Sequence, residues 1–180
     1  MRVISGKVRG MKLVAPEGES TRPTLDRVKE AVFSMLLPYI NEALVLDLFA
    51  GSGAMGIEAL SRGAKKSVFV DSSEKAINCI KANINNARMA EDSLIIHSDF
   101  CKFLCEYSGA FDIVFIDPPY EAGLYEKVFS LLASNNLISP DGLIIAEWDY
   151  ENGIGNLPSE FELIKEKKYG RVGISVFKRR

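Results

Sequence analysis

From residue 44 onward, short apolar runs alternate with segments in which apolar residues recur every three or four positions. Runs of the first kind are typical of buried strands, and segments of the second kind are typical of helices that cover a sheet. Strands are predicted at 44–49, 67–70, 94–96, 111–116 and 143–146, and helices at 54–61, 100–107 and 125–132. A further helix, capped by Ser72 or Ser73, is predicted to reach Ala87. This order favours a parallel sheet with helices on both faces.

The last segments of the chain follow a different pattern. Residues 161–168 and 173–178 predict an antiparallel pair joined by a turn at Tyr169-Gly170-Arg171. With this pair the count reaches about seven strands. We therefore expect an α/β fold with a doubly wound, seven-stranded, mostly parallel, Rossmann-like sheet and an appended hairpin.

Residues 1–40 precede this core and have a pattern of their own. Residues 2–14 predict a basic hairpin around Gly6 and Gly10. Thr24 is placed to cap a helix that ends near Pro38 and whose apolar face consists of Leu25, Val28, Val32, Met35 and Leu36. A chain of 180 residues suits one domain, so we expect an extension at 1–40 on a single core at 41–180.

Composition excludes several classes of protein. The longest run without a charged residue spans 128–140 and is shorter than the roughly 18 apolar residues that a membrane span requires. Residues 1–7 lack the apolar region of a secretory signal, and three cysteines are a sparse, odd set, so we expect a cytoplasmic protein. His97, Cys101 and Cys105 do not complete a metal site, and we expect the cysteines to be small buried apolar groups.

The formal charge of −2 hides an uneven distribution. Residues 1–30 carry a net +3 and residues 165–180 a net +6, which leaves a strongly acidic middle. If the fold brings the two ends together, a basic lip would border an acidic body and suit a docking polyanion. Simple solvation of two charged faces is the alternative.

A glycine-rich turn follows the first strand of the core. Gly51-Ser52-Gly53-Ala54-Met55-Gly56 matches G-x-G-x-x-G between a strand and a helix, where glycines let the backbone approach a ligand. No lysine follows, so it is not a phosphate-binding P-loop. Asp71 ends the second strand, where it is placed to hold ribose hydroxyls of either a dinucleotide or an adenosine cofactor.

Asp47 favours a cationic ligand over a dinucleotide. It interrupts an apolar strand four residues before Gly51, where it would repel a pyrophosphate. A buried carboxylate needs a partner, and S-adenosylmethionine offers an ammonium and a sulfonium. Asp99 is placed to accept the adenine amine and Phe100 to pack on the ring. The alternative for Asp47 is a carboxylate that only binds backbone N–H groups of the turn.

Asp117-Pro118-Pro119-Tyr120 follows the predicted strand 111–116 and is the most specific motif of the chain. The lone pair of an exocyclic amine is delocalised, and hydrogen-bond acceptors are needed to turn it toward a methyl donor. The Asp117 side chain and the Pro118 carbonyl can each accept one N–H. The prolines stiffen the corner, and Tyr120 offers a ring on which a base can stack.

At these motifs the chain resembles the class I S-adenosylmethionine-dependent methyltransferases that act on amines and carry D-P-P-Y. Its flanks resemble the bacterial 16S ribosomal RNA (guanine-966-N2) methyltransferase family. The matching segments are 2–6, 9–13, 22–33, 47–53, 115–120 and 169–171, so the resemblance covers nearly the whole chain. It implies methyl transfer to the N2 amine of a flipped guanine in that RNA.

The resemblance also implies roles for particular residues. Those expected to engage the guanine are Asp117, Pro118, Pro119 and Tyr120. The cofactor would be framed by Asp47, Phe49, Gly51, Gly53, Asp71, Ser72, Asp99 and Phe100, with 22–24, including Thr24, closing the pocket. We expect RNA contacts from Arg2, Lys7, Arg9, Arg22, Arg27 and Arg171. The partner would be 16S rRNA within a partly assembled 30S subunit, bound by a monomer without metal or membrane.

Other interpretations remain open at this point. Adenine-N6 methylation of DNA or RNA would use the same D-P-P-Y chemistry. A dinucleotide-dependent oxidoreductase would use the glycine turn, and a non-catalytic RNA-binding domain would use only the basic ends. Glu147 and Trp148 end the strand predicted at 143–146, where they could contact substrate or only border the core.

Overall fold

The computed structural model describes residues 1–16, 23–119, 124–151, 153–155 and 157–180. Their strands are β1 (Leu44–Leu48), β2 (Lys66–Asp71), β3 (Ser93–His97), β4 (Phe111–Ile116), β5 (Ile138–Asp149), β6 (Phe161–Tyr169) and β7 (Val172–Arg179). Their helices are α1 (Pro23–Leu36), α2 (Ala54–Ser61), α3 (Glu74–Ala87), α4 (Phe100–Glu106) and α5 (Leu124–Ser134). None of these helices combines the length and apolar character that crossing a membrane requires.

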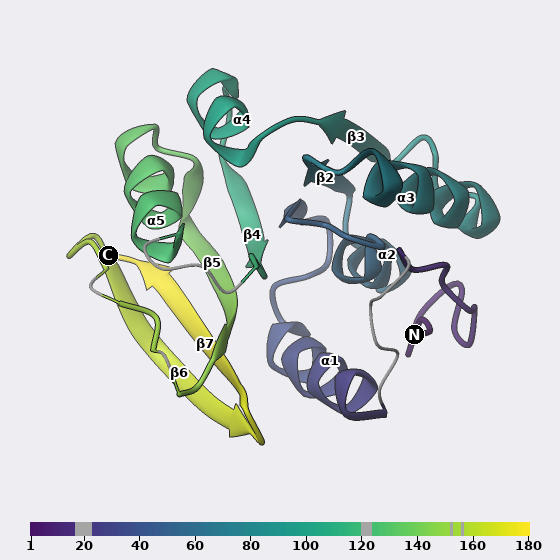
Figure 1. The fold of residues 1–180 in the computed structure, drawn as a ribbon, viewed down its shortest axis with the longest axis horizontal. Coiled ribbons are helices and arrows are strands. Elements are labelled where there is room, and N and C mark those ends of the chain that lie inside the picture. The colour runs from purple at the N-terminus through teal and green to yellow at the C-terminus, as the bar shows by residue number, and fades with distance from the viewer. Residues whose placement is uncertain (17–22, 120–123, 152, 156) are drawn as a thin grey trace.

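Within the described residues the strands form one sheet in the order β3-β2-β1-β4-β5-β7-β6. The first five in this order run parallel, and β7 pairs antiparallel with both β5 and β6. The expected doubly wound, mostly parallel sheet with an appended hairpin is confirmed (Figure 1). In this order β1 and β4 lie at the point where the chain reverses direction across the sheet, the usual ligand edge of such folds.

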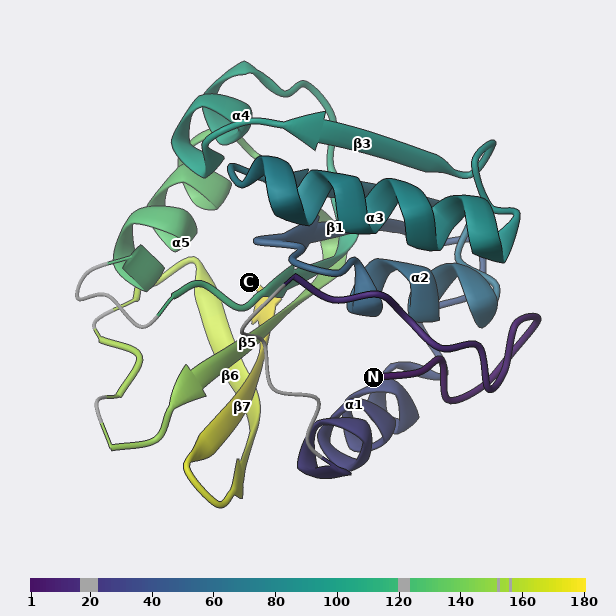
Figure 2. The same cartoon turned by 45° about the vertical axis from the view of Figure 1, so that its right-hand side comes forward.

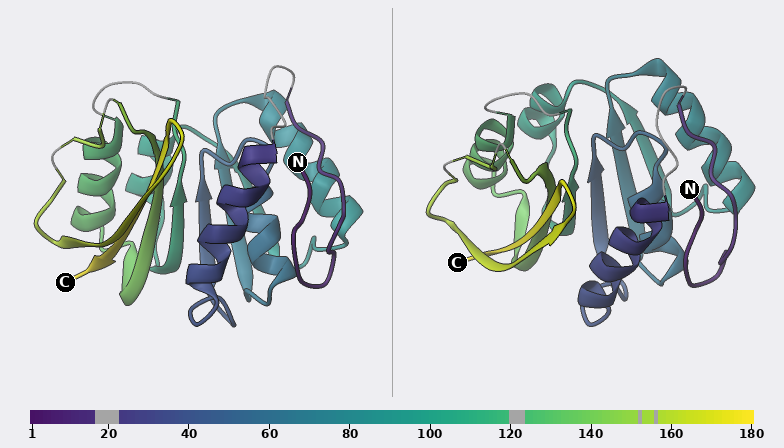
Figure 3. Two further views of the ribbon diagram at one scale, coloured as in Figure 1. Left: turned by 90° about the horizontal axis from the view of Figure 1, so that it is seen from below. Right: turned by 60° about the horizontal axis from the view of Figure 1, so that its bottom comes forward.

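Helices cover both faces of the sheet, and each face has its own core. On one face, buried residues of α1, α2 and α3, among them Phe33, Ile57 and Ile80, pack with Val45 and Phe115 of the sheet. Buried residues of α4 and α5 cover the other face. Figures 2 and 3 show these two layers and the long hairpin of β6 and β7 at one side.

The N-terminal segment is less regular than the predicted hairpin. Its two arms run antiparallel, with hydrogen bonds from the Val3 N–H to the Met11 carbonyl at 2.9 Å and from the Leu13 N–H to the Met1 carbonyl at 3.1 Å. Only one β-bridge forms among its described residues, between Arg2 and Lys12. The segment lies along α2 and α3 and is held there mostly by side chains of the core, so it does not need a ladder of its own (Figure 2).

Two smaller predictions need correction. Thr24 does not precede α1, because the helix begins one residue earlier at Pro23, and proline suits a first helical position since it has no N–H to leave unbonded. The strand predicted at 143–146 is longer, from Ile138 to Asp149, because β5 continues on both sides of its buried centre to pair with β4 and β7.

Candidate active site

The carboxyl ends of β1, β4 and β5 meet at one edge of the sheet. Asp47 of β1 pairs in register with Phe115 of β4, and two residues later β4 leads into Asp117. Ile116 pairs in turn with Ala146 of β5. The glycine turn and the D-P-P-Y corner therefore leave the same edge from adjacent strands, as their positions in the sequence predict.

The backbone of the glycine turn adopts conformations that most residues avoid. The φ angles of Gly51 and Gly53 are +54° and +76°, and Phe49 reaches +67° although it carries a side chain. Positive φ at an aromatic residue costs of order 1–3 kcal/mol and clusters at ligand-binding sites. A Cβ at Gly56 would lie 2.3 Å from the Phe69 ring, so the third glycine serves the packing of α2 on β2.

Asp47 is buried beneath this turn. Its Oδ2 accepts a hydrogen bond from the Gly56 N–H at 2.9 Å, so the carboxylate does bind the backbone of the turn. Burial raises the pKa of Asp47 to about 7, and the nearby Asp71 carboxylate adds to the effect, whereas the N–H groups of Gly56 and Met55 oppose it. No ion pair among the described side chains compensates this charge. A cationic group of a bound ligand would compensate the Asp47 charge.

Asp71 at the end of β2 also binds backbone. Its Oδ2 accepts from the Gly51 N–H and its Oδ1 from the Ser73 N–H, both at 2.8 Å. It therefore fixes the glycine turn and the start of α3 together. Ser73, not Ser72, caps α3, and Ser72 is exposed with its carbonyl 2.9 Å from His97 Nε2.

Asp99 and Phe100 lie where β3 leads into α4. Asp99 is exposed and caps the helix, its Oδ1 accepting from the Cys101 N–H at 2.8 Å. The ring of Phe100 lies 5.2 Å from that of Phe49, centroid to centroid. The two aromatic rings thus join the turns after β1 and β3.

At the D-P-P-Y corner, Asp117 and Pro119 are exposed and Pro118 is buried. Tyr120 and Arg22 lie outside the described residues. Thr24 lies in the first turn of α1, which starts toward the carboxyl edge of the sheet because the helix runs down to the connection before β1 (Figure 3).

Sequence reasoning missed the buried charges that hold the N-terminal segment. Glu58 of α2 is fully buried, and its carboxylate accepts from the N–H groups of Ile4 at 2.7 Å and Ser5 at 3.0 Å. It also pairs with Arg62 Nε at 2.7 Å and Lys29 Nζ at 3.2 Å. Burial lowers the pKa of Lys29, against the opposing effect of Glu58. A lone carboxylate in the apolar helix AMGIEALS was the available signal.

Asn83 of α3 makes a second attachment. This buried amide accepts from the Val14 N–H and donates to the Val14 carbonyl, each at 2.8 Å, and also donates to the Ser52 carbonyl at 2.9 Å. It connects the end of the N-terminal segment directly to the glycine turn. An asparagine on the apolar face of the predicted helix was the available signal, which sequence reasoning did not use.

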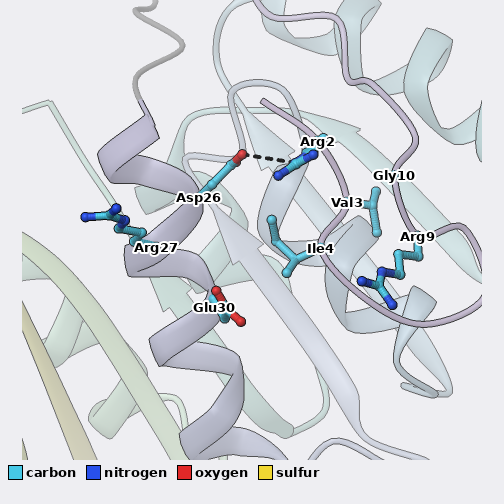
Figure 4. Close-up of a pocket in the computed structure, with 8 residues that line it drawn as sticks. All are labelled: Arg2, Val3, Ile4, Arg9, Gly10, Asp26, Arg27 and Glu30. Atoms are coloured by element: carbon cyan, nitrogen blue, oxygen red, sulfur yellow. Dashed lines mark ion pairs between the residues drawn. The ribbon is translucent and has the colours of Figure 1, made fainter.

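A pocket of about 400 Å³ opens between the N-terminal segment and α1. Arg2, Arg9 and Arg27 line it together with Asp26 and Glu30, and Figure 4 shows the Arg27 side chain pointing away from Arg2 and Arg9, to the other side of α1. Arg2 Nε lies 3.4 Å from Asp26 Oδ2, and the arginines are exposed. Of the basic residues expected to contact RNA, Arg2 and Arg9 therefore lie on the same side of α1, and the Arg27 guanidinium lies on the other.

The other basic residues lie apart from this pocket. Lys7 is exposed at the turn of the N-terminal segment, where its N–H donates to the Ser61 carbonyl. Arg171 is exposed at the β6–β7 turn, 3.4 Å from Asp149 Oδ2. The two basic ends do not join into one lip, because the N-terminal segment is attached to α2 and α3 whereas β7 pairs with β5 at the other side of α1 (Figure 3).

The structure shows the surroundings of Trp148 and of the three cysteines. Trp148 is a core residue, since it is buried and its Nε1 donates to Ser175 Oγ at 2.9 Å. The expectation of buried cysteines is wrong. Cys79 and Cys101 are partly exposed and Cys105 is exposed, because they lie toward the outer faces of α3 and α4.

Comparison with known proteins identifies the family. The chain is 36% identical to Ribosomal RNA small subunit methyltransferase D of Escherichia coli, over 99% of this chain and 90% of that protein. It is 39% identical to the protein of the same name from Haemophilus influenzae, over 98% and 93%. The solved structure of yhhF from Escherichia coli matches with a TM-score of 0.91 and 37% identity, over 100% and 98%. The family described as Conserved hypothetical protein 95 matches residues 1–178, and the chain belongs to it.

Proposed function

We propose that this protein transfers a methyl group from S-adenosylmethionine to the N2 amine of a guanine in 16S ribosomal RNA. The observation that carries the proposal is the common edge of β1, β4 and β5, where Asp117-Pro118-Pro119 leaves the strand next to the buried Asp47 and the glycine turn. The names of the two full-length relatives, which refer to small-subunit ribosomal RNA, support the substrate.

The described residues fit this cofactor. Asp47 is a buried carboxylate without a compensating cation among them, and it would face the amino-acid part of S-adenosylmethionine. Gly51 and Gly53, with positive φ, let the main chain come close to it. Asp71 would accept from ribose hydroxyls, and Phe49, Ser72, Asp99 and Phe100 would surround the adenosine. When bound, the cofactor supplies a methyl group on an electron-poor sulfur.

The residues of the D-P-P-Y corner would bind and orient the amine. The Asp117 carboxylate and the Pro118 carbonyl accept one N–H each, which draws the nitrogen lone pair out of conjugation with the ring. Pro118 and Pro119 donate no N–H and fix their φ angles, so the acceptors stay in place. Tyr120 would stack on the base, and Thr24 would close the pocket from α1.

RNA would reach this edge along the N-terminal segment and α1. Arg2, Arg9 and Arg27 line one pocket, and Lys7, Arg22 and Arg171 would extend the contact to phosphates on either side. Turning a guanine out of its stack costs a few kcal/mol and is cheapest in a loop. We also propose that the enzyme acts in the cytoplasm as a monomer on a partly assembled 30S subunit.

Radiolabelled methyl transfer tests this function. The substrates are naked 16S rRNA and small subunits from cells that lack the enzyme. The labelled nucleoside is then identified and its position in the RNA is mapped. We expect one labelled N2-methylguanosine in subunits. Labelled N6-methyladenosine would instead favour the adenine reaction, and no transfer with tight nicotinamide binding would favour an oxidoreductase.

A further inference from the structure

Glu147 lies beside the proposed reaction site, near the carboxyl end of β5. In the register of β4 and β5, Ile116 pairs with Ala146. The next residue on each parallel strand is Asp117 and Glu147, so the two stand on neighbouring strands at the carboxyl edge of the sheet. Adjacent strands are about 4.8 Å apart, which brings the two carboxylates within reach of one small ligand.

The two side chains belong to the same face of the sheet. Leu143 and Ile145 of β5 pack in the core under α1, α2 and α3, as does Phe115 of β4. Ile144 and Ala146 pack in the opposite core. Because side chains alternate along a strand, Glu147 continues the face of Ile145, and Asp117 continues the face of Phe115. This is also the face on which Asp47 lies buried under the glycine turn.

The Glu147 carboxyl group is placed to accept a hydrogen bond from a ligand. It is partly buried, and burial raises its pKa to about 7. Among the described residues, no hydrogen bond or ion pair reaches its carboxyl group, although its main-chain carbonyl accepts from the Tyr125 hydroxyl at 2.6 Å. That bond fixes the end of β5. A partly buried carboxylate is stabilised when a ligand supplies N–H donors.

We propose that Glu147 accepts the ring N–H adjacent to the reactive amine and thereby selects guanine. This inference rests on the proposed function and deepens it. Guanine presents the N1–H donor next to its N2 amine, so Asp117 can accept from the amine while Glu147 accepts from the ring. Adenine and cytosine present a ring nitrogen lone pair next to their amines, which Glu147 repels when it is ionised, above its pKa of about 7. The neighbouring carboxylates thus specify the base as well as hold it.

The test compares two bases that share the reactive amine. 2-Aminopurine carries an amine at C2 but has an acceptor in place of N1–H. The probe is 16S rRNA, ligated so that the mapped target position holds guanine or 2-aminopurine, and assembled with ribosomal proteins if the wild-type enzyme requires it. The readout is the ratio of kcat/KM for the two RNAs, measured above the Glu147 pKa of about 7 so that this carboxyl group is ionised. It is compared for the wild type, Glu147→Gln, Glu147→Ala and the control Glu162→Gln on exposed β6.

We expect the wild type and Glu162→Gln to prefer guanine on the order of a thousandfold or more, because a site built to bind an N–H rejects an analogue that lacks it. In Glu147→Gln the ratio should fall at least about tenfold, since the amide can donate to the 2-aminopurine ring. Glu147→Ala should also lower it. Cofactor affinity should be unchanged in all variants, which shows that they are folded.

The two proposals fail in different ways. If the wild type methylates guanine RNA and both Glu147 variants keep its full preference over 2-aminopurine, the role of Glu147 is refuted and the proposed function stands. If the wild type methylates neither RNA although it binds the cofactor, the proposed function itself is refuted.

Discussion

Replacing Glu58 with glutamine should loosen the N-terminal segment from the core. The amide has nearly the same shape but no charge, and it leaves Lys29 and Arg62 without their counterion although their side chains are only 4% and 10% exposed. In the glutamine, an NH2 group also replaces one of the two carboxylate oxygens, and this group cannot accept a hydrogen bond from the Ile4 or Ser5 N–H. Breaking a buried ion pair in this way costs about 3–5 kcal/mol.

The predicted cost is large enough to measure by two methods. For a chain of this size, each kcal/mol lowers Tm by about 2–4 °C, so Glu58→Gln should lower it by roughly 6–20 °C. Urea unfolding gives the free energy directly. Glu91→Gln, an exposed change in the turn before β3, is the control and should stay within about 0.5 kcal/mol of the wild type.

A double-mutant cycle with Lys29→Met sharpens the test. In the Lys29→Met background, Glu58→Gln leaves only Arg62 as a buried cation without its counterion. The double variant should therefore be more stable than the sum of the two single changes predicts. Burial already lowers the pKa of Lys29, and losing Glu58 lowers it further. In Glu58→Gln, Lys29 of the folded protein therefore loses its proton at a lower pH than in the wild type, whereas Lys29 of the unfolded chain keeps its proton up to about pH 10.5. Stability rises with pH wherever the unfolded chain binds more protons, so the difference in unfolding free energy between wild type and Glu58→Gln should shrink as the pH rises.

The reasoning would be refuted by a loss below about 1 kcal/mol, or by strict additivity with Lys29→Met. Either result would mean that the N-terminal segment is held by other contacts. The attachments by Ser61 and Asn83 would then be the ones to test.

Four further predictions concern the site and the N-terminal segment. Asp47→Asn should raise the free energy of unfolding by up to a few kcal/mol above pH 7, and this gain should vanish as the pH falls toward 4. The reason is that the wild-type pKa of about 7 makes ionisation of Asp47 costly in the folded state but not in the unfolded chain. The same variant should bind S-adenosylmethionine more weakly by calorimetry, and equal affinity would argue against a cationic ligand. Charge reversal of Lys7 and Arg9 should weaken RNA binding and flatten its salt dependence by about one unit per lost phosphate contact, as filter binding at several salt concentrations can show. Gly6→Ala should lower Tm measurably, since φ is +87° and a Cβ would lie 1.8 Å from the Ser61 carbonyl oxygen, and an unchanged Tm would show that this close approach is not needed.

The elements that position the site could be predicted because each has a strong local signal. Ala54–Ser61 and Phe111–Ile116 were expected at the observed bounds, since a glycine turn precedes the first and the second is a short apolar run between turn residues. Asp47, Gly51 and Asp71 could be placed near one another because parallel strands end at one edge.

What the sequence did not reveal depends on contacts between distant segments. Glu58 reads as one acid in a helix, and only the fold shows that it meets Ile4, Lys29 and Arg62. The separation of the two basic ends is likewise a consequence of strand order, because β7 is placed beside β5. Besides the ribose role proposed for it, Asp71 binds the N–H groups of Gly51 and Ser73, a role that local spacing does not disclose.

Single-turnover methyl transfer by Asp117→Ala, with cofactor affinity measured on the same preparation, tests the central claim most directly. If Asp117 orients the amine, the rate with 16S rRNA should fall on the order of a hundredfold or more while the Kd for S-adenosylmethionine changes little. An unchanged rate, or an equal loss of rate and cofactor affinity, would contradict the account.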